Sequence, residues 1–389
     1  MGALAEDWEH GGFGLYVHWP FCAAKCPYCD FNSHVAATID HLAWRDAYVA
    51  EINRTARLLP GRRLKSIYFG GGTPSLMEAE TVDAIINAAQ QSWHFDNDIE
   101  ITLEANPGSV EAAKFGDFRA SGVNRVSIGV QALKDADLKR LGRIHSVAEA
   151  RAAIEVAQTC FDRVSFDLIY GRQDQSLEAW LSELEDALAI GTDHLSLYQL
   201  TVEDGTPFAQ RQAAGGLRGL PGEALSADLF EATEAMCSGH GLQRYEVSNF
   251  ARPGQQSTHN LIYWRFGDYA GVGPGAHGRI TLDGHRHASA AWRNPQKWLM
   301  AVSEGNGDEV LEKLSGMEQA EECLMMGLRT VDGVSMDRLA RLSGTGLTSS
   351  GVQRLVDLGA IGIDGGIITV KKQYVSLLNS VLGELMFDQ

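Results

Sequence analysis

The chain has 389 residues, of which 44% are hydrophobic and 21% charged, and its formal net charge is −17. This length accommodates a barrel-sized core together with a smaller domain. The negative charge disfavours a nucleic-acid-binding surface and electrostatic docking to an anionic membrane. No apolar stretch approaches the roughly 20 residues that span a membrane. Segment 1–10 carries acidic residues and lacks the apolar core of a secretion signal.

The first predicted strand, 15–21, leads into a loop that carries Cys22, Cys26 and Cys29 at the spacing C-x3-C-x2-C. Thiolate is the usual ligand of iron–sulfur clusters, and three of them can hold three irons of a four-iron cluster. The fourth iron is then left open to bind a small molecule. The spacing therefore predicts a 4Fe-4S cluster with one open iron.

A zinc knuckle and a redox dithiol are the alternative interpretations of this loop. A structural zinc site needs four ligands, and no second C-x-x-C pair follows to complete one. The other cysteines, Cys160, Cys237 and Cys323, stand singly and are expected to be buried as small hydrophobic residues. The chain shows no disulfide framework, and a cluster suits a reducing compartment. We therefore expect a cytoplasmic protein.

Five more strand–helix units are predicted to follow the cysteine loop. The strands are expected at 65–69, 98–103, 125–130, 163–169 and 194–200. The first helix is predicted at 39–59 and the last at 176–190, and a capping box at 75–78 is expected to open the second. Six alternations indicate a parallel sheet with helices outside. Six units rather than eight predict an open, partial (β/α)6 TIM-like barrel.

The alternation ends near residue 201. A helix is predicted at 223–238 and a strand at 245–250, whereas 251–295, rich in His, Trp, Tyr and Gly, is expected to be loop-like. After a linker near 305–307, three helices and a hairpin resemble a winged-helix module. The predicted domains are 1–305 and 306–389. The second is a winged-helix-like α+β module with a negative charge balance, so a DNA-binding role is not expected.

Candidate site residues lie at or near the ends of the predicted strands, where ligands bind in parallel α/β folds. Gly70–Thr73 follows a strand directly, and glycines there let the backbone approach a ligand. Glu104 and Asp167 can accept hydrogen bonds from ribose hydroxyls or an amino group. Arg143 can pair with a carboxylate.

With this context, the three-cysteine loop resembles the radical S-adenosylmethionine (SAM) superfamily. The chain also resembles the oxygen-independent coproporphyrinogen III oxidase (HemN) family. Five segments carry that resemblance, in order along the chain: Tyr-Val-His-Trp-Pro-Phe-Cys, Gly-Gly-Gly-Thr-Pro, Thr-Leu-Glu-Ala-Asn-Pro, Gly-Val-Gln and Asp-Leu-Ile-Tyr-Gly. The resemblance implies that SAM chelates the open iron and contacts Tyr16, Tyr28, Gly71, Gly72, Thr73, Glu104, Gln131, Arg143, Asp167 and Gln199.

Two features depart from the oxidase proper. The oxidases have a fourth cysteine just after the triad, as Cys-Gly-Cys, where this chain has Cys29-Asp30-Phe31. They also have a longer N-terminal extension, whereas 15 residues precede Tyr16 here. Both features argue against decarboxylation of coproporphyrinogen.

The segment His259-Asn260-Leu261-Ile262-Tyr263-Trp264 matches H-N-x-x-Y-W, a signature of the HemW family of heme chaperones, which are relatives of the oxidase. The match makes His259 a candidate heme ligand, since imidazole ligates heme iron and aromatic faces pack on a macrocycle. The alternative for His259 is a hydrogen-bonded structural histidine. Other candidate ligands are His277, His285 and His287.

The resemblance implies a chaperone that binds heme, SAM and a 4Fe-4S cluster and delivers heme to acceptor hemoproteins, membrane-associated acceptors being one alternative. A radical SAM enzyme that decarboxylates porphyrin propionates is the second hypothesis. In that case the cluster reduces SAM to methionine and a 5′-deoxyadenosyl radical, which abstracts hydrogen from the propionate. A tRNA-modifying radical SAM enzyme is the more distant hypothesis, and the charge of −17 argues against it.

Overall fold

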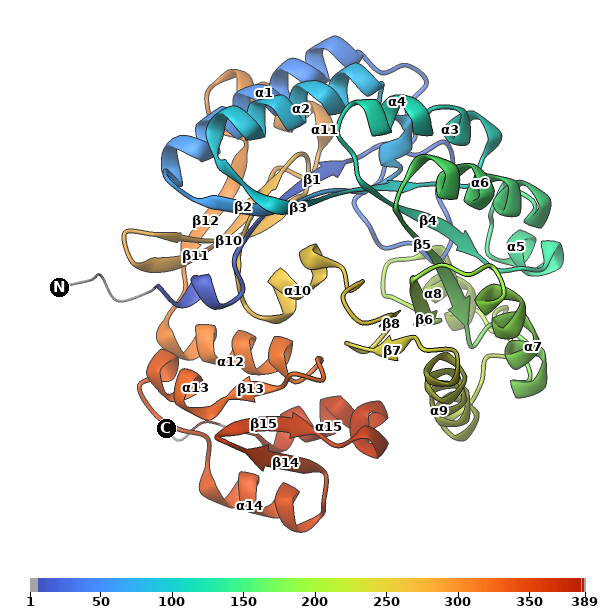
Figure 1. The fold of residues 1–389 in the computed structure, drawn as a ribbon, viewed down its shortest axis with the longest axis vertical. Coiled ribbons are helices and arrows are strands. Elements are labelled where there is room, and N and C mark those ends of the chain that lie inside the picture. Colours follow the sequence, from blue (N-terminus) through green and yellow to red (C-terminus); the bar gives the residue numbers. More distant parts are fainter. Residues whose placement is uncertain (1–5, 386, 388–389) are drawn as a thin grey trace.

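The computed structural model describes residues 6–385 and 387, so the first five residues of the segment examined for a secretion signal lie outside it. One large sheet organises the described chain, with the strand order β12-β11-β10-β9-β1-β2-β3-β4-β5-β6-β8-β7. It arches around an open interior, with the helices that follow β1–β5 on its outer face and helix α10 on the inner side (Figure 1). The expected partial α/β barrel is therefore confirmed.

Six parallel strands, β1–β6, form the middle of the sheet. Their bounds are Phe13–Trp19, Arg63–Gly71, His94–Ala105, Arg125–Gln131, Arg163–Tyr170 and His194–Gln199. The helices between them are α1 (His41–Leu58), α2 (Ala79–Ser92), α3 (Ser109–Ala113), α4 (Phe115–Ala120), α5 (Asp135–Arg140), α6 (Val147–Cys160) and α7 (Leu177–Leu188).

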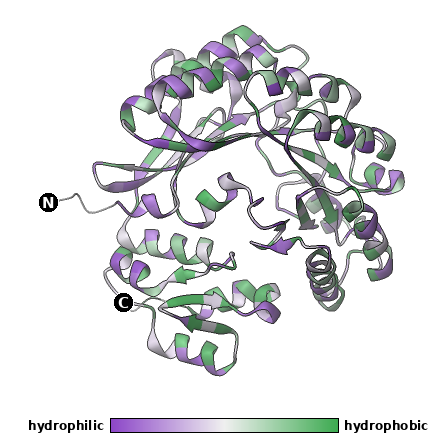
Figure 2. Cartoon of the chain, in the orientation of Figure 1, coloured by the Kyte–Doolittle hydropathy of each residue, from purple (hydrophilic) through white to green (hydrophobic). Residues whose placement is uncertain are grey.

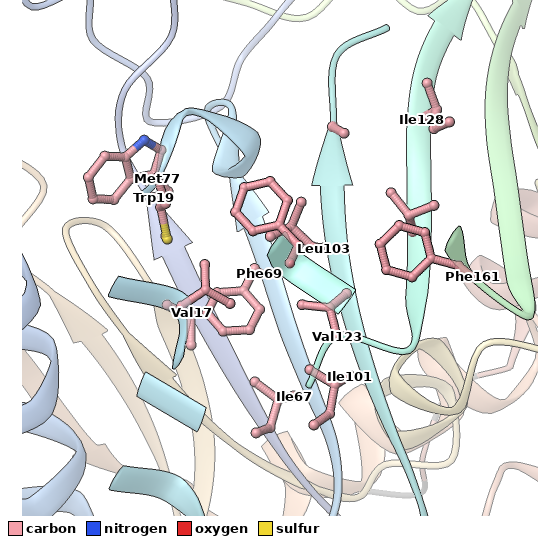
Figure 3. Close-up of a cluster of buried hydrophobic side chains, with 14 of the residues drawn as sticks. Val17, Trp19, Ile67, Phe69, Met77, Ile101, Leu103, Val123, Ile128 and Phe161 are labelled. Carbon is pink, nitrogen blue, oxygen red and sulfur yellow. The ribbon is translucent and has the colours of Figure 1, made fainter. Parts of the chain in front are cut away.

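The two faces of the central strands differ in chemistry. Alternate residues of a strand point to opposite faces, and Val17, Phe69 and Leu103 share the outer face with other buried apolar side chains (Figure 3). The alternate positions carry polar groups such as Glu104 and Asp167, which face the interior. Hydrophobic and hydrophilic residues alternate along the outer helices (Figure 2), and the residues that these helices bury are mostly apolar. The apolar layer thus holds the barrel together and leaves a polar interior.

The capping box predicted at 75–78 is wrong. Pro74–Leu76 forms a 3-10 turn, and α2 begins at Ala79 with Glu78 as an N-cap that makes no side-chain cap bond. Ser75 is fully buried, and its hydroxyl accepts a hydrogen bond from the Asn106 amide at 3.4 Å. Ser75 thus bonds to the backbone N–H of Asn106, a residue that is distant in the sequence, instead of capping α2.

The loop-like structure predicted for 251–295 is also wrong. This segment holds α10 (Thr258–Trp264), β9 (Asp268–Val272), β10 (His277–Leu282), β11 (His285–Ala291) and the first residue of α11 (Pro295–Ser303). β9 pairs in parallel with β1, and Phe13 lies opposite Asp268. Pairing across more than 250 residues adds β9 to the sheet, and β10 and β11 follow it as an antiparallel hairpin. These strands therefore depend on contacts within the sheet more than on a local strand pattern.

The strand predicted at 245–250 is split in the structure. β7 (Gln243–Arg244) and β8 (Asn249–Ala251) flank a bend that contains Tyr245. The Tyr245 hydroxyl bonds to His194 Nε2 at 2.9 Å, which draws this residue out of the strand and into the interior. Helices α8 (Pro207–Ala213) and α9 (Glu223–Gly239) precede it.

The C-terminal module contains a small sheet in the order β13-β15-β14. Its elements are α12 (Gly316–Gly327), β13 (Val334–Ser335), α13 (Met336–Ser343), α14 (Ser349–Asp357), β14 (Ile361–Asp364), β15 (Ile367–Val370) and α15 (Leu378–Glu384). The hairpin is close to its predicted position. Before the module, β12 (Asp308–Lys313) pairs with β11 of the large sheet. The domain boundary at 305/306 stays a prediction.

Candidate functional site

A pocket of about 350 Å3 opens at the carboxyl ends of the parallel strands, a volume in the range of small-ligand sites. Its wall includes all three cysteines of the loop after β1, the glycine turn after β2, and side chains from β3–β6. The strand-end rule thus brings together residues that lie far apart in the sequence. Most of the predicted SAM contacts line this pocket: Tyr28, Gly71, Gly72, Thr73, Glu104, Gln131, Arg143, Asp167 and Gln199.

Backbone hydrogen bonds hold the cysteine loop at its start and close a turn within it. The Cys22 amide donates to the His34 carbonyl at 2.9 Å, and the Cys29 amide donates to the Cys26 carbonyl at 3.2 Å. Thr73 Oγ1 donates to Cys22 Sγ at 3.4 Å, which ties the loop to the turn after β2. All three thiols are half-buried and free of disulfides. They are therefore available together as ligands at one wall of the pocket.

Burial raises the pKa of Cys22 and of Cys29, and the neighbouring Cys26 raises both pKa values further. Three thiolates at one wall therefore call for a positive partner such as iron. Within the described chain, no three His, Cys, Asp or Glu side chains converge on a site for a single metal ion. A cluster makes a different demand, because each thiolate binds a different iron. Three cysteine side chains at one wall are a donor set that fits such a cluster.

The turn after β2 packs directly against the cysteine loop. The Gly72 amide donates to the Trp19 carbonyl at 2.7 Å, and the Thr73 amide donates to the Phe21 carbonyl at 2.8 Å. A Cβ on Gly72 would lie 2.6 Å from the Phe21 carbonyl oxygen, too close for any side chain. Gly71 has a φ of +107°, which favours glycine. The glycines therefore serve the packing of the loop as well as access to the pocket.

Two carboxylates face the pocket from β3 and β5, on either side of Ser127 on β4. Tyr68 donates to Glu104 Oε1 at 2.8 Å, and Ser127 donates to Asp167 Oδ1 at 3.3 Å. Burial raises the pKa of Glu104 to about 7, and the charge of Asp167 adds to this rise. Burial also raises the pKa of Asp167 to about 6. A bound cation or hydrogen-bond donor would stabilise both ionised groups.

Arg143 stands between the cysteine loop and the strands. Its Nη1 donates to Cys26 Sγ at 3.3 Å, and its Nη2 donates to Asn106 Oδ1 at 2.6 Å and to the Gly129 carbonyl at 2.9 Å. Its Nε is buried and has no partner among the described residues. A buried unpaired donor beside the thiols suits an anionic group such as a carboxylate.

Gln131 ends β4 with a φ of +74°, an uncommon conformation for a residue with a side chain. The register between β4 and β5 shifts between Ile128 and Gln131, so the strand end is distorted at the pocket. Strained backbone of this kind is concentrated at functional sites. Gln199 reaches the same pocket from the end of β6.

Tyr16 is a predicted SAM contact that does not line the pocket. It lies on the inner face of β1, where its hydroxyl bonds to His18 Nδ1 at 3.0 Å and its ring stacks on Tyr68 at a centroid distance of 6.3 Å. The pocket also contains residues that the sequence argument missed, among them Asn106, Tyr198, Thr201 and Glu203. All of them follow or end a strand, so a stricter use of the strand-end rule could have found them.

His259, the predicted heme ligand, is 1% exposed inside the barrel. Its Nδ1 bonds to Ser66 Oγ at 2.7 Å and its Nε2 to the Tyr263 hydroxyl at 2.7 Å. An axial ligand needs a free nitrogen that faces open space, and this geometry provides neither. Ligation by His259 would require α10 to move away from β2. Of the three alternatives, His277 and His285 are exposed and His287 is half-buried.

The chain is similar to known proteins of one superfamily. The Radical SAM superfamily matches residues 16–187. The chain is 43% identical over 327 residues to the mitochondrial radical S-adenosyl methionine domain-containing protein 1 of Bos taurus, which covers 82% of this chain and 74% of that protein. It is 42% identical over 288 residues to the heme chaperone HemW of Escherichia coli, which covers 73% of this chain and 75% of that protein.

The solved structure of coproporphyrinogen III oxidase (HemN) from Escherichia coli has a TM-score of 0.79 and 22% identity, and the match covers 96% of this chain and 89% of that one. This likeness shows the fold alone. Fold and site together define a radical SAM protein. The chain belongs to the radical SAM family that contains the heme chaperone HemW and radical S-adenosyl methionine domain-containing protein 1. No helix in the described chain is long and apolar enough to cross a membrane.

Proposed function

We propose that this protein is a heme chaperone that binds heme and delivers it to acceptor hemoproteins. The observation that carries the proposal is the similarity to proteins named heme chaperone HemW, at 42% identity for Escherichia coli and 37% for Haemophilus influenzae. The second of these matches covers 88% of each chain. Heme binding and the identity of the acceptors are part of this proposal.

The proposal includes a 4Fe-4S cluster on Cys22, Cys26 and Cys29 and a SAM molecule in the pocket beside it. Such a cluster, when bound, supplies one iron that can hold the amino and carboxylate groups of SAM. Arg143, with its unpaired Nε, would hold the carboxylate. Glu104 and Asp167 would accept hydrogen bonds from the ribose or amino group. Their raised pKa values indicate carboxylates that lack sufficient partners, and a ligand that donates hydrogen bonds would supply them.

A side chain that ligates heme iron must be accessible to a bound porphyrin. His277 begins β10, His285 begins β11, and both are exposed. Since His259 is enclosed by Ser66 and Tyr263, the two exposed histidines are better placed to ligate heme in this conformation.

A radical SAM enzyme acting on porphyrins is the second candidate. The pocket that favours it is the one described above, since a SAM site beside a cluster can also support turnover. The replacement of the oxidase's fourth cysteine by Cys29-Asp30-Phe31 argues against the oxidase reaction.

Heme transfer tests the proposal. The full chain, with its cluster reconstituted without oxygen, is loaded with heme and mixed with an apo-hemoprotein, and the acceptor's Soret band is followed. We expect heme to reach the acceptor faster than from free heme or from heme-loaded serum albumin. A parallel anaerobic incubation with reductant, SAM and coproporphyrinogen III is analysed by mass spectrometry. Decarboxylated product over many turnovers, without accelerated transfer, would establish the oxidase instead.

A further inference from the structure

The ring of His259 is held rigidly inside the barrel. Besides its bonds to Ser66 and Tyr263, it stacks on Tyr68 at a centroid distance of 4.8 Å with 19° between the planes, and on Tyr16 at 6.2 Å. Burial lowers the pKa of His259 to about 3, so the ring stays neutral at working pH. A neutral ring with both nitrogens bonded is a fixed surface against which Tyr68 packs.

Tyr68 connects this ring to the pocket. Ser66 and Tyr68 are two residues apart on β2 and share its inner face, so one bonds to His259 while the other stacks on it. Tyr16 stacks on Tyr68 from β1. The Tyr68 hydroxyl then donates to Glu104 Oε1 at 2.8 Å, and Glu104 lines the pocket. Tyr68 thus has its ring fixed by α10 and its hydroxyl directed at a pocket carboxylate.

Helix α10 is itself anchored to β3, the strand of Glu104. Glu100 Oε1 accepts from Ser257 Oγ at 3.2 Å and from the His259 amide at 3.0 Å, while its Oε2 accepts from the Thr258 amide at 3.0 Å. Arg163 pairs with Glu100 Oε2 at 2.7 Å. Glu100, which holds the start of α10, and Glu104, which lines the pocket, are therefore four residues apart on the same strand.

We infer that α10 is a positioning element for the pocket: His259 fixes Tyr68, and the Tyr68 hydroxyl orients and stabilises the ionised carboxylate of Glu104 that receives SAM. The inference rests on the proposed binding of SAM. It gives H-N-x-x-Y-W a role inside the barrel instead of at a heme iron. Tyr68 and His259 are positioning residues, because neither lines the pocket.

The inference predicts a particular pH dependence. The groups that face Glu104 are Tyr68 from β2, Asp167 from β5, Arg125 from β4, the Gly71 backbone, Tyr16 from β1, Tyr198 from β6 and Tyr263 from α10. Among them, the Tyr68 hydrogen bond lowers the pKa of Glu104. Loss of that hydroxyl raises the pKa of Glu104 above about 7. The acid limb of SAM binding then moves to higher pH.

The test is calorimetric titration of SAM into the full, cluster-loaded protein across a pH series, for wild type and Tyr68→Phe. We expect the variant to bind about 3- to 10-fold more weakly near pH 7 and to approach wild type near pH 9, as one raised carboxyl pKa requires. The matched control is Tyr170→Phe, which removes the hydroxyl of a buried tyrosine on the outer face of β5, where Tyr170 stacks on Trp180. Its pH profile should be unchanged.

Superimposable pH profiles for wild type and Tyr68→Phe would overturn the inference. Failure of wild type to bind SAM at any pH would instead overturn the proposed SAM site. A second variant, His259→Ala, keeps the Tyr68 hydroxyl but removes its support. It should weaken SAM binding while the affinity for hemin, measured by Soret titration, stays at the wild-type value. Loss of hemin affinity with unchanged SAM binding would assign His259 to heme and reject its positioning role.

Discussion

Glu100 and Glu104 lie on the same face of β3, four residues apart, Glu100 fully buried and Glu104 half-buried at the pocket, yet their surroundings shift their pKa values in opposite directions. Burial alone would raise the pKa of Glu100, but Arg125 and Arg163, with the amides of α10, hold it below the ordinary value. For Glu104, burial prevails and the pKa rises to about 7. Around Glu100, at the deep end of the interior, positive and donating partners outweigh burial, whereas around Glu104, at the pocket end, the Tyr68 hydroxyl and the Gly71 backbone do not. We interpret the first as structural and the second as prepared for a ligand.

The largest expected effect is the loss of the metal centre. In Cys26→Ala, the remaining Cys22 and Cys29 cannot hold the three irons of the proposed cluster, so we expect near-complete loss of bound iron and of the visible absorbance after anaerobic reconstitution. SAM binding should be lost with it. Cys160→Ala is the control, because Cys160 lies at the end of α6 and does not line the pocket. A Cys26→Ala protein that retains wild-type iron would rule out the predicted cluster.

The next largest effect is expected from a substitution at Glu100, at the deep end of the interior. Glu100→Gln removes the negative partner of Arg163 and weakens three hydrogen bonds at the start of α10, so we expect the free energy of unfolding to fall by about 2 to 3 kcal/mol. Arg163 is 26% exposed and keeps the Gln255 and Gln256 carbonyls as partners, so the loss stays below that of a fully buried ion pair. Urea titration followed by circular dichroism measures it. Glu155→Gln, an exposed change on α6, serves as the control. An equal loss in both variants would remove the contrast between the two ends of β3.

At the pocket end, removal of the Glu104 charge should stabilise the ligand-free protein, the opposite of the effect expected at Glu100. A carboxyl whose folded pKa is raised destabilises the fold as pH rises through its unfolded value, and the cost is complete above the folded pKa. Glu104→Gln should therefore stabilise the ligand-free protein by about 1 to 2 kcal/mol near pH 8, with little change near pH 4. Its SAM affinity near pH 8 should fall about tenfold. Parallel urea titrations and calorimetry decide this. A variant that is less stable at pH 8 would show that Glu104 is structural.

The difference between Glu100 and Glu104 also shows what the sequence could predict. The cysteine spacing is local, and Glu104 and Asp167 follow from strand periodicity and the strand-end rule, so these could be named in advance. Glu100 could not, because its partners are Arg163 and the amides of α10, 63 and more than 150 residues away. His259 was assigned by motif, but its partner Ser66 lies 193 residues away. Contacts between residues so far apart in the sequence are set by the fold, so the local sequence around Glu100 and His259 does not predict them.

The smallest expected effect comes from a charge pair outside the interior. Arg265 Nη2 lies 2.8 Å from Asp332 Oδ2 just after α10, and both side chains are about half exposed, at 49% and 51%. Water screens such a pair, so Arg265→Ala should lower the free energy of unfolding by less than about 1 kcal/mol. Urea titrations at low and high salt measure it, and the small difference from wild type should vanish at high salt. A loss comparable to that of Glu100→Gln would mean that contact with the C-terminal module, and not the Glu100 network, fixes α10 in place.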